Sequence, residues 1–372
     1  MIFDLTDRKI NGKSKQIWEA FMDQENQTPH KRRVRYKGKY PKKFEEKYKE
    51  LQPEKYKDTI EHVIQKGNTP AGMHISIMVK EIIDFLNIQP GEIGFDATLG
   101  YGGHTKAMLK CLNGKGHIYA TDVDPEESDK TKKRLADQGF GEDLLTVKLQ
   151  NFCTIDEIAK EVGGFDFILA DLGVSSMQID NPKRGFSFKV DGPLDLRLNQ
   201  DAGISAAERL DTITRDELAG MLYENSDEPY CEELAKAITD EIRKGNRIDT
   251  TTKLRQVIEK TLDFLPEKEK KDTIKKTCQR TFQALRIDVN REFEVLYEFM
   301  EKLPDALRPG GRVAILTFHS GEDKLVKKAL KEGYKAGIYS DYAKDVIRPS
   351  AQECAQNGRA RSTKMRWAVK NK

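Results

Sequence analysis

The chain has 372 residues, of which 34 % are charged, and its mean hydropathy is −0.68. No apolar run approaches the roughly 18 residues of a membrane span, and the first residues lack the pattern of a signal peptide. We therefore expect a cytoplasmic protein with no membrane partner, built as two domains or as one domain with a sizeable insertion. Five scattered cysteines without a Cys-x-x-Cys pair argue against a disulfide scaffold and a structural zinc site, and no metal is expected.

The net charge of +3 hides two basic ends around an acidic centre. Residues 1–70 carry a net charge of +6, residues 348–372 again +6, and the part between them −9. Basic ends of this kind suit a polyanionic partner such as RNA, although Lys-rich ends can also be simply solvated.

Residues 1–72 are expected to be a basic N-terminal extension, in which Lys31 to Lys49 include ten basic residues. Aromatic side chains interleave with these charges, a mixture that suits a phosphate backbone with stacked bases. Tyr40, Phe44 and Tyr48 also lie four residues apart, as in a helix stripe that packs on the main domain. Both interpretations stay open from the sequence.

After the extension, strand and helix patterns alternate, which indicates a doubly wound α/β fold with a parallel sheet. Ile93 to Ala97 is an apolar strand pattern, and a glycine-rich turn separates it from a helix that begins at His104. Phe165 to Asp171 is almost fully apolar, as expected of a strand covered on both faces. The other expected elements are a helix through Met78 and Leu86, a strand at 117–122, a helix from Pro125, a strand at 144–149, a strand at 312–318, a helix at 322–335 and a last strand at 364–369.

A long insertion separates the fourth and fifth expected strands. The gap between them is about 140 residues, whereas a normal crossover needs only some tens of residues. Roughly 100 residues between Gln178 and Gln279 therefore form an insertion, with helix patterns at 215–223 and 232–243.

One helix is expected to return the chain from the insertion to the sheet. Apolar residues from Phe282 to Met300 recur every three or four positions, which makes a continuous stripe. Pro304 and the turn Pro309 to Gly311 are then expected to lead into the fifth strand.

The glycine-rich turn is the first candidate binding element. A strand, a glycine loop and a helix in succession are how an α/β sheet holds a nucleotide-like ligand. Gly100, Gly102 and Gly103 let the backbone approach the ligand, and the helix N-terminus at His104 presents free N–H groups. Thr105 stands where the dinucleotide fingerprint has its third glycine, so the loop does not fit that fingerprint. An ordinary tight turn is the alternative.

Three more candidates follow later strands and should meet the loop at one edge of the sheet. Asp122 ends the second strand, about nineteen residues after Gly103, where an acid can accept both hydroxyls of a ribose. Phe152 offers a flat face for an adenine, or else belongs to the core. Asp171 ends the fourth strand and lies next to the reaction centre, or else caps a helix.

Nine segments carry a resemblance to a known family. They are Met73-His74, Asp96–His104, Asp122–Pro125, Asp171–Gln178, Lys183–Phe188, Asp191–Arg197, Arg280–Arg286, Phe318–Ser320 and Arg359–Lys364. In this order they are similar to the RsmH (MraW) family of S-adenosylmethionine-dependent methyltransferases, and the resemblance runs from about His74 to Arg366. It implies a Rossmann-like class I methyltransferase domain at 73–178 and 280–372, with an inserted helical substrate-recognition domain at 179–279.

The resemblance also implies an activity, a cofactor and a set of site residues. The family methylates N4 of a cytidine in the decoding centre of 16S rRNA, position 1402, so 16S rRNA or the 30S ribosomal subunit is the implied partner. The implied contacts to S-adenosylmethionine are Gly102, Gly103, His104, Asp122, Phe152, Asp171 and Gln178. Asp171 is also our candidate catalytic residue, as an acceptor for the amine hydrogen, because such an acceptor would receive the charge that develops on the amine.

Four more residues are candidates for the substrate. Arg184, Phe186 and Arg197 follow the fourth strand and could clamp, stack or bind the phosphate of a cytosine that has left its stack. Phe186 could equally pack the insertion onto the sheet. His319 follows the fifth strand and could point into the same cleft, although a lone histidine is more often structural.

Two other functions remain as alternatives to the methyltransferase. A non-catalytic RNA-binding assembly factor would be expected to have an eroded glycine loop or to lack Asp171, and this sequence keeps both. A nicotinamide-dependent oxidoreductase would need the glycine spacing that this loop lacks. The sequence does not fix the oligomeric state, for which a homodimer is one option.

Overall fold

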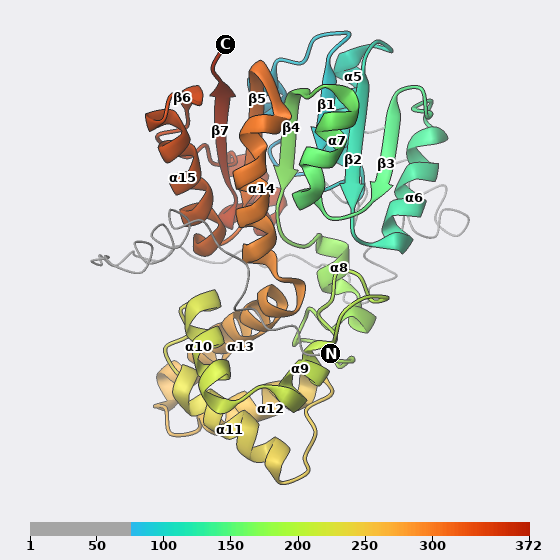
Figure 1. Ribbon diagram of the computed structural model, residues 1–372. Helices are drawn as coiled ribbons and strands as arrows, with labels where there is room; N and C mark the ends of the chain where they lie inside the picture. Colours follow the sequence, from blue (N-terminus) through green and yellow to red (C-terminus); the bar gives the residue numbers. More distant parts are fainter. Residues whose placement is uncertain (1–75) are drawn as a thin grey trace, which may run out of the picture. The chain divides into compact units, whose positions relative to one another are not determined.

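The computed structural model describes residues 76–372 (Figure 1). The extension expected at 1–72 therefore lies outside the described residues. The same holds for the choice between RNA binding and helix packing for its aromatic residues. No helix within residues 76–372 is long and apolar enough to cross a membrane.

A seven-stranded sheet is the centre of the described chain, in the order β3-β2-β1-β4-β5-β7-β6 (Figure 1). The first five strands are parallel, whereas β7 pairs antiparallel with both β5 and β6. The predicted doubly wound α/β fold is confirmed, with an antiparallel edge added to the parallel sheet. The strands are β1 (Ile93–Asp96), β2 (His117–Asp122), β3 (Leu145–Leu149), β4 (Phe165–Asp171), β5 (Leu307–Thr317), β6 (Tyr339–Tyr342) and β7 (Lys364–Lys370).

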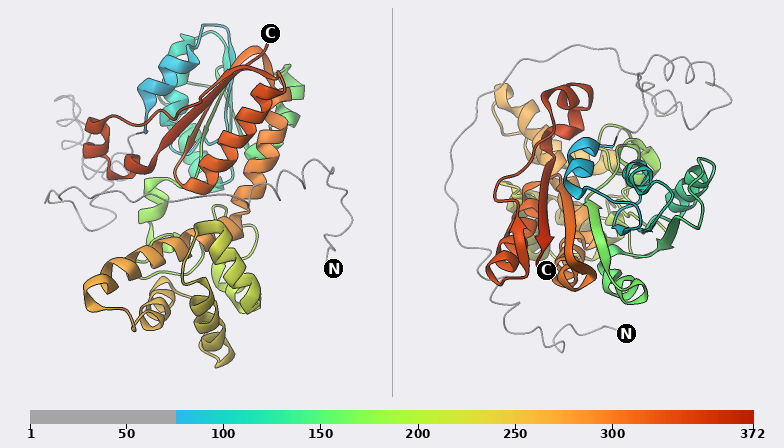
Figure 2. Two further views of the ribbon diagram at one scale, coloured as in Figure 1. Left: turned by 90° about the vertical axis from the view of Figure 1, so that its left-hand side faces the viewer. Right: turned by 90° about the horizontal axis from the view of Figure 1, so that it is seen from above.

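Helices cover both faces of this sheet (Figure 2). Ile168 and Ala170 of β4 share a core with α7, α14 and α15, whereas Phe167 and Leu169 share one with α4, α5 and α6. Successive side chains of a strand point to opposite faces, so β4 must be apolar throughout its length. The covering helices are α4 (Val79–Leu86), α5 (Gly103–Leu112), α6 (Pro125–Ala136), α7 (Ile155–Val162), α14 (Glu292–Ala306) and α15 (Ser320–Lys335).

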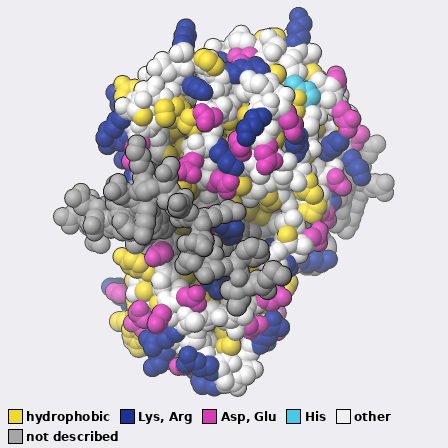
Figure 3. All heavy atoms as spheres, in the orientation of Figure 1, with side chains coloured by type: hydrophobic (Ala, Val, Ile, Leu, Met, Phe, Trp, Pro, Cys, Tyr) yellow, Lys and Arg dark blue, Asp and Glu magenta, His cyan; other side chains and the backbone are white. Residues whose placement is uncertain are grey.

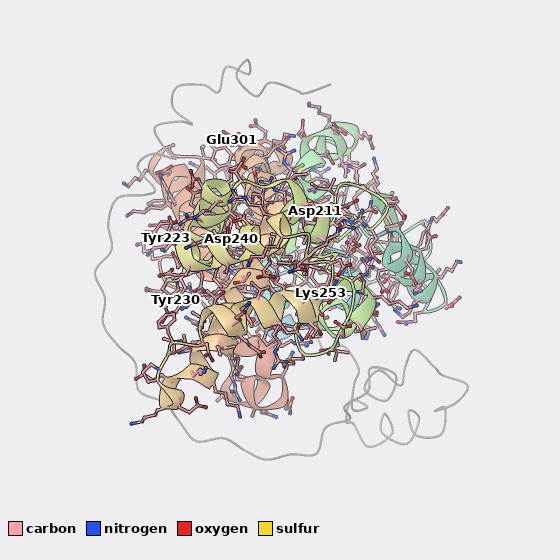
Figure 4. All side chains as sticks on the ribbon, turned by 90° about the horizontal axis from the view of Figure 1, so that it is seen from below. Asp211, Tyr223, Tyr230, Asp240, Lys253 and Glu301 are labelled. Atoms are coloured by element: carbon pink, nitrogen blue, oxygen red, sulfur yellow. The ribbon has the colours of Figure 1, made fainter. Side chains whose placement is uncertain are left out.

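The insertion between β4 and β5 is helical and lies beyond the carboxyl ends of the parallel strands (Figures 1 and 2). Its larger helices share an apolar core of their own, which includes Leu222 and Leu254. Tyr223, Asp240 and Lys253 lie on its side away from the sheet (Figure 4). Its helices are α8 (Ser176–Asp180), α9 (Ala206–Thr212), α10 (Arg215–Ser226), α11 (Cys231–Arg243), α12 (Thr251–Thr261) and α13 (Glu267–Asn290).

Two helices, α13 and α14, return the chain from the insertion to the sheet, where one helix was expected. Arg291 has φ 52°, a left-handed conformation that ends α13 and starts α14, so the apolar stripe spans two helices. Pro304 lies inside α14 near its end, where it removes only one late N–H donor. β5 begins at Leu307, and the expected turn at Pro309 to Gly311 lies within this strand, at a register irregularity opposite β4.

Several short elements complete the described chain, and the edge strand β6 among them was not predicted. It has four residues and follows the expected helix α15 directly, without a long apolar run of its own. The remaining elements are η2 (Phe152–Thr154), η3 (Pro182–Arg184), α16 (Ala351–Gln356) and η4 (Gly358–Ser362).

Candidate cofactor and substrate cleft

A cleft of about 590 Å³ lies at the carboxyl ends of β1, β2, β4 and β5, where the sheet faces the helical insertion. The sheet side of the cleft includes the glycine loop and the residues that end or follow these strands, and the insertion side comes from α8, the loop around Phe186, and α13. Of the sequence-predicted residues, those that line it are Gly102, Gly103, His104, Asp122, Phe152, Asp171, Gln178, Phe186 and His319.

The glycine loop forms one wall of the cleft, and two of its glycines have no room for a side chain. Gly102 has φ 70°, and a Cβ there would lie 2.8 Å from Thr131 Cγ2. A Cβ on Gly103 would lie 2.0 Å from Ser76 Oγ. Because α5 begins at Gly103, the free N–H groups of its first turn lie at the cleft, which suits a polar or anionic ligand group.

Asp122 ends β2 and is fixed by two backbone donors. The N–H of Gly100 donates to its Oδ2 at 2.8 Å, and the N–H of Asp124 donates to its Oδ1 at 2.9 Å. Each carboxylate oxygen keeps a lone pair for a further hydroxyl, because an ionised carboxylate has about four acceptor sites. Burial raises the pKa of Asp122 to about 6, against the lowering effect of these hydrogen bonds.

Asp171 ends β4 with one carboxylate oxygen engaged and one free. Its backbone N–H donates to Thr98 Oγ1 at 2.8 Å, and its Oδ2 lies 3.4 Å from His104 Nδ1. Its Oδ1 is buried and has no hydrogen-bond partner among residues 76–372. A buried acceptor without a partner is costly, so a ligand donor that reached this atom would add stability.

Phe152 and Gln178 line the cleft and also have structural contacts. Phe152 is half-buried and packs edge-on against Phe299, with ring centroids 5.2 Å apart, so both of its expected roles stay open. Gln178 forms a capping box with Ser175 at the start of α8, and its Nε2 donates to Asp124 at 3.4 Å.

Two predicted substrate residues do not line the cleft. Arg184 is only 5 % exposed, forms an ion pair with Asp124, and donates from Nη1 to the carbonyl of Leu198 at 2.9 Å. Arg197 donates from Nε and Nη2 to the two oxygens of Asp195, each at 2.8 Å. Internal carboxylates engage both guanidinium groups, and the expectation that these arginines clamp the base or bind its phosphate stays a prediction.

Phe186 and His319 do line the cleft, from opposite sides. Phe186 is half-buried and packs against the core of the insertion, and because it also lines the cleft, its stacking role stays open. His319 caps α15: its Nδ1 accepts the backbone N–H of Glu322 at 3.5 Å, and its Nε2 lies 3.1 Å from Glu322 Oε1.

The cleft lining also contains an ionic cluster that was not predicted from the sequence. Arg286 donates to both carboxylate oxygens of Glu292, at 2.7 and 2.8 Å, and Glu292, His319 and Glu322 bring ligand atoms within 4.8 Å of one another. These atoms are close enough together for a metal ion, but Arg286 already neutralises Glu292. Burial raises the pKa of Glu322, and the charge and hydrogen bond of His319 outweigh burial, so the pKa is lowered. The signals in the sequence were the segment that ends at Arg286 and His319 in Phe318–Ser320.

The fold is that of a class I S-adenosylmethionine-dependent methyltransferase, with a helical insertion between β4 and β5. It has the strand order of this class with an antiparallel β7, a glycine loop after β1, and acids at the ends of β2 and β4. Residues 71–371 match the profile of the MraW methylase family, and the chain belongs to this family.

Curated relatives match nearly the whole chain. Ribosomal RNA small subunit methyltransferase H 1 of Agathobacter rectalis is 87 % identical over 349 residues, which are 94 % of this chain and 99 % of that protein. The protein of the same name from Lachnoclostridium phytofermentans is 67 % identical over 367 residues, 98 % of this chain and all of that protein. Ribosomal RNA small subunit methyltransferase H of Acidobacterium capsulatum is 36 % identical over 301 residues, 80 % of this chain.

Proposed function

We propose that this protein transfers the methyl group of S-adenosylmethionine to N4 of a cytidine, position 1402, in the decoding centre of 16S rRNA. Its activity as an S-adenosylmethionine-dependent methyltransferase of small-subunit rRNA follows from its family. The observation that carries the choice of an amine as acceptor is the buried, unpartnered Oδ1 of Asp171. The 30S subunit as the form of the substrate, and a homodimeric state, stay predictions.

The residues of the cleft fit S-adenosylmethionine. Asp122 keeps lone pairs for the two ribose hydroxyls, and Phe152 presents a half-buried aromatic ring at the next strand end. Glu127 adds a second buried carboxylate oxygen without a partner among the described residues, also in the lining of the cleft. When bound, this cofactor supplies a methyl group on a positively charged sulfur, which is already a strong electrophile.

Catalysis then depends mainly on alignment and on an acceptor for the amine hydrogen. The amine of cytosine is a poor nucleophile because its lone pair is delocalised into the ring. A hydrogen bond from this amine to Asp171 Oδ1 localises the lone pair on nitrogen and orients it. The N4–methyl bond forms as the methyl–sulfur bond breaks, the electron pair of that bond stays on sulfur, and the N4 proton moves to Asp171 Oδ1.

The insertion supplies the features that RNA requires. A target base must leave its stack to reach the cleft, and Phe186 is an aromatic side chain on which it can stack. Phe188 lines this cleft and also a second cleft of about 680 Å³ along α12 and α13. Lys271 and Lys275 line the second cleft, are exposed, and form no ion pair within the described part of the chain. Figure 3 shows further Lys and Arg side chains toward the lower end of the insertion.

Labelled methyl transfer to 30S subunits that lack the modification tests the proposal. After digestion to nucleosides, N4-methylcytidine is the expected labelled product, and its chromatographic separation from 5-methylcytidine, which has the same mass, identifies the acceptor atom. A label on a ring carbon would overturn the choice of atom. Cofactor binding without transfer would favour the non-catalytic assembly factor.

A further inference from the structure

His104 is buried behind Asp171, with a partner at each ring nitrogen. It lies in the first turn of α5 and is 7 % exposed. Its Nε2 lies 2.9 Å from the carbonyl oxygen of Ile77, and its Nδ1 lies 3.4 Å from Asp171 Oδ2. The ring therefore connects the chain before α4, the glycine loop and the end of β4.

This geometry places one proton between His104 and Asp171. A carbonyl oxygen only accepts, so His104 Nε2 must carry a hydrogen and donate to Ile77. In a neutral ring Nδ1 would then be a bare lone pair that faces an ionised carboxylate, which is repulsive. Either Nδ1 also carries a hydrogen, so that the ring is an imidazolium, or Asp171 is protonated on Oδ2.

The surroundings favour the imidazolium. Asp171 on β4 and Asp96 on β1 are the charged groups that act on the ring, and both are acids. Burial lowers the pKa of His104, but the hydrogen bond and charge of Asp171, the Ile77 carbonyl and the charge of Asp96 outweigh it, so the pKa is raised above its ordinary value.

We propose that His104 is a positioning residue, a buried imidazolium that holds Asp171 ionised by engaging Oδ2 and leaves Oδ1 free for the cytosine amine. The proposal rests on the proposed function for its catalytic meaning but not for its geometry. An amine that has just gained a methyl group is strongly acidic, so it gives up its proton readily to an acceptor held at Oδ1. The imidazolium keeps its own protons throughout.

The backbone around the pair is also fixed. Thr98 accepts the N–H of Asp171 and donates its own N–H to Asp96 Oδ1 at 3.1 Å. Thr105 Oγ1 donates to Asp96 Oδ2 at 2.6 Å, which connects α5 to the end of β1. His104 engages Oδ2 from within this framework and so helps to set the direction of Asp171 Oδ1.

Imidazole nitrogen NMR tests the proposal without any RNA. The chain has six histidines, and the His104 signals are assigned by their loss in His104→Gln. At pH 6.5 we expect both ring nitrogens of His104 to be more than half protonated in the full-length protein, and the Asp171→Asn variant to shift its titration to lower pH. A neutral ring at pH 6.5, or a titration that Asp171→Asn leaves unchanged, would overturn the proposal.

Kinetics provide the second measurement. In His104→Gln, which can still donate to Ile77 but carries no charge, kcat should fall about tenfold to a hundredfold. This fall in kcat should exceed any loss of affinity for S-adenosylmethionine, and the acid limb of the kcat profile should move. Equal losses in kcat and cofactor affinity, or an unchanged profile, would indicate a merely structural histidine. His117→Gln, on β2 outside the cleft, is the matched control. If wild type transfers no methyl group at all, the proposed function fails while the NMR result stands.

Discussion

Arg184 and Asp124 form a buried ion pair that connects the loop after β4 to the start of α6. Asp124 is the N-cap of α6 and accepts the N–H of Glu127 at 3.2 Å, while Gln178 donates to its other oxygen. Asp124, two residues after Asp122, therefore connects the end of β2 to the first residues of the insertion. The position of Phe186, directly after this loop, depends on the pair.

Loss of the Arg184 guanidinium should destabilise the folded protein. Arg184→Met leaves the Asp124 carboxylate buried and unpaired, and we expect the free energy of unfolding in urea to fall by about 3–5 kcal/mol. Lys183→Met, at the exposed neighbouring position, should change it by less than about 0.5 kcal/mol. Unchanged stability together with weaker RNA binding in Arg184→Met would instead indicate that this arginine contacts the RNA substrate directly.

Cofactor affinity should weaken in mild acid because of Asp122. Its pKa of about 6 lies above the ordinary value, so the free protein takes up a proton there as the pH falls from neutral. Ribose hydroxyls need the ionised carboxylate, so the Kd for S-adenosylmethionine should be lowest above pH 6 and rise about tenfold near pH 5. Titration calorimetry between pH 5 and 8 measures this dependence. Asp122→Asn should bind S-adenosylmethionine more weakly, and its Kd should no longer change near pH 6. If the Kd of this variant still changed near pH 6, another group would be responsible for the pH dependence.

The wall of the glycine loop can be tested by a pair of substitutions. Gly103→Ala places a methyl group 2.0 Å from Ser76 Oγ, so the loop must shift, and we expect cofactor affinity to fall about tenfold or more. Ser76→Ala removes that oxygen and should recover most of the loss in the double variant, although a contact of 3.2 Å to the Ser76 Cβ remains. Equal affinities for the single and the double variant would show that a different contact makes Gly103 necessary.

The second cleft should contribute to RNA binding. Charge reversal at Lys271 and Lys275 on α13 should raise the KM for 30S subunits about tenfold, reduce the slope of log affinity against log salt by about two, and leave kcat unchanged. The same reversal at Lys268 and Lys276, exposed on the same helix but outside that cleft, is the control. Equal effects of the two double variants would mean that only overall charge matters.

The sequence predicted the elements that carry a strong local pattern. Strands β2 and β4 have the bounds expected for them, because a central parallel strand is apolar on both faces and stands out. The break at Arg291 was missed, since a left-handed arginine leaves no glycine or proline signal and the apolar stripe continues across it. Strand β6 is too short to predict from its own pattern.

Within the site, positions were easier to predict than partners. The ends of β1, β2 and β4 place the glycine loop, Asp122 and Asp171 together because parallel strands end at one edge. Which long side chains reach into the cleft could not be predicted, because Arg184 pairs with an acid sixty positions away in the chain. The contact between His104 and Asp171 depends in the same way on the packing of α5 against β4.

The most direct test of the account is the mapping of the methyl group in 16S rRNA. Fragments of rRNA from 30S subunits treated with wild type or with Asp171→Asn would be sequenced by mass spectrometry. We expect one N4-methylated cytidine, at position 1402, with wild type, and a rate about a hundredfold or more lower with Asp171→Asn at saturating S-adenosylmethionine. Methylation at another position or atom, or full activity in Asp171→Asn, would contradict the account.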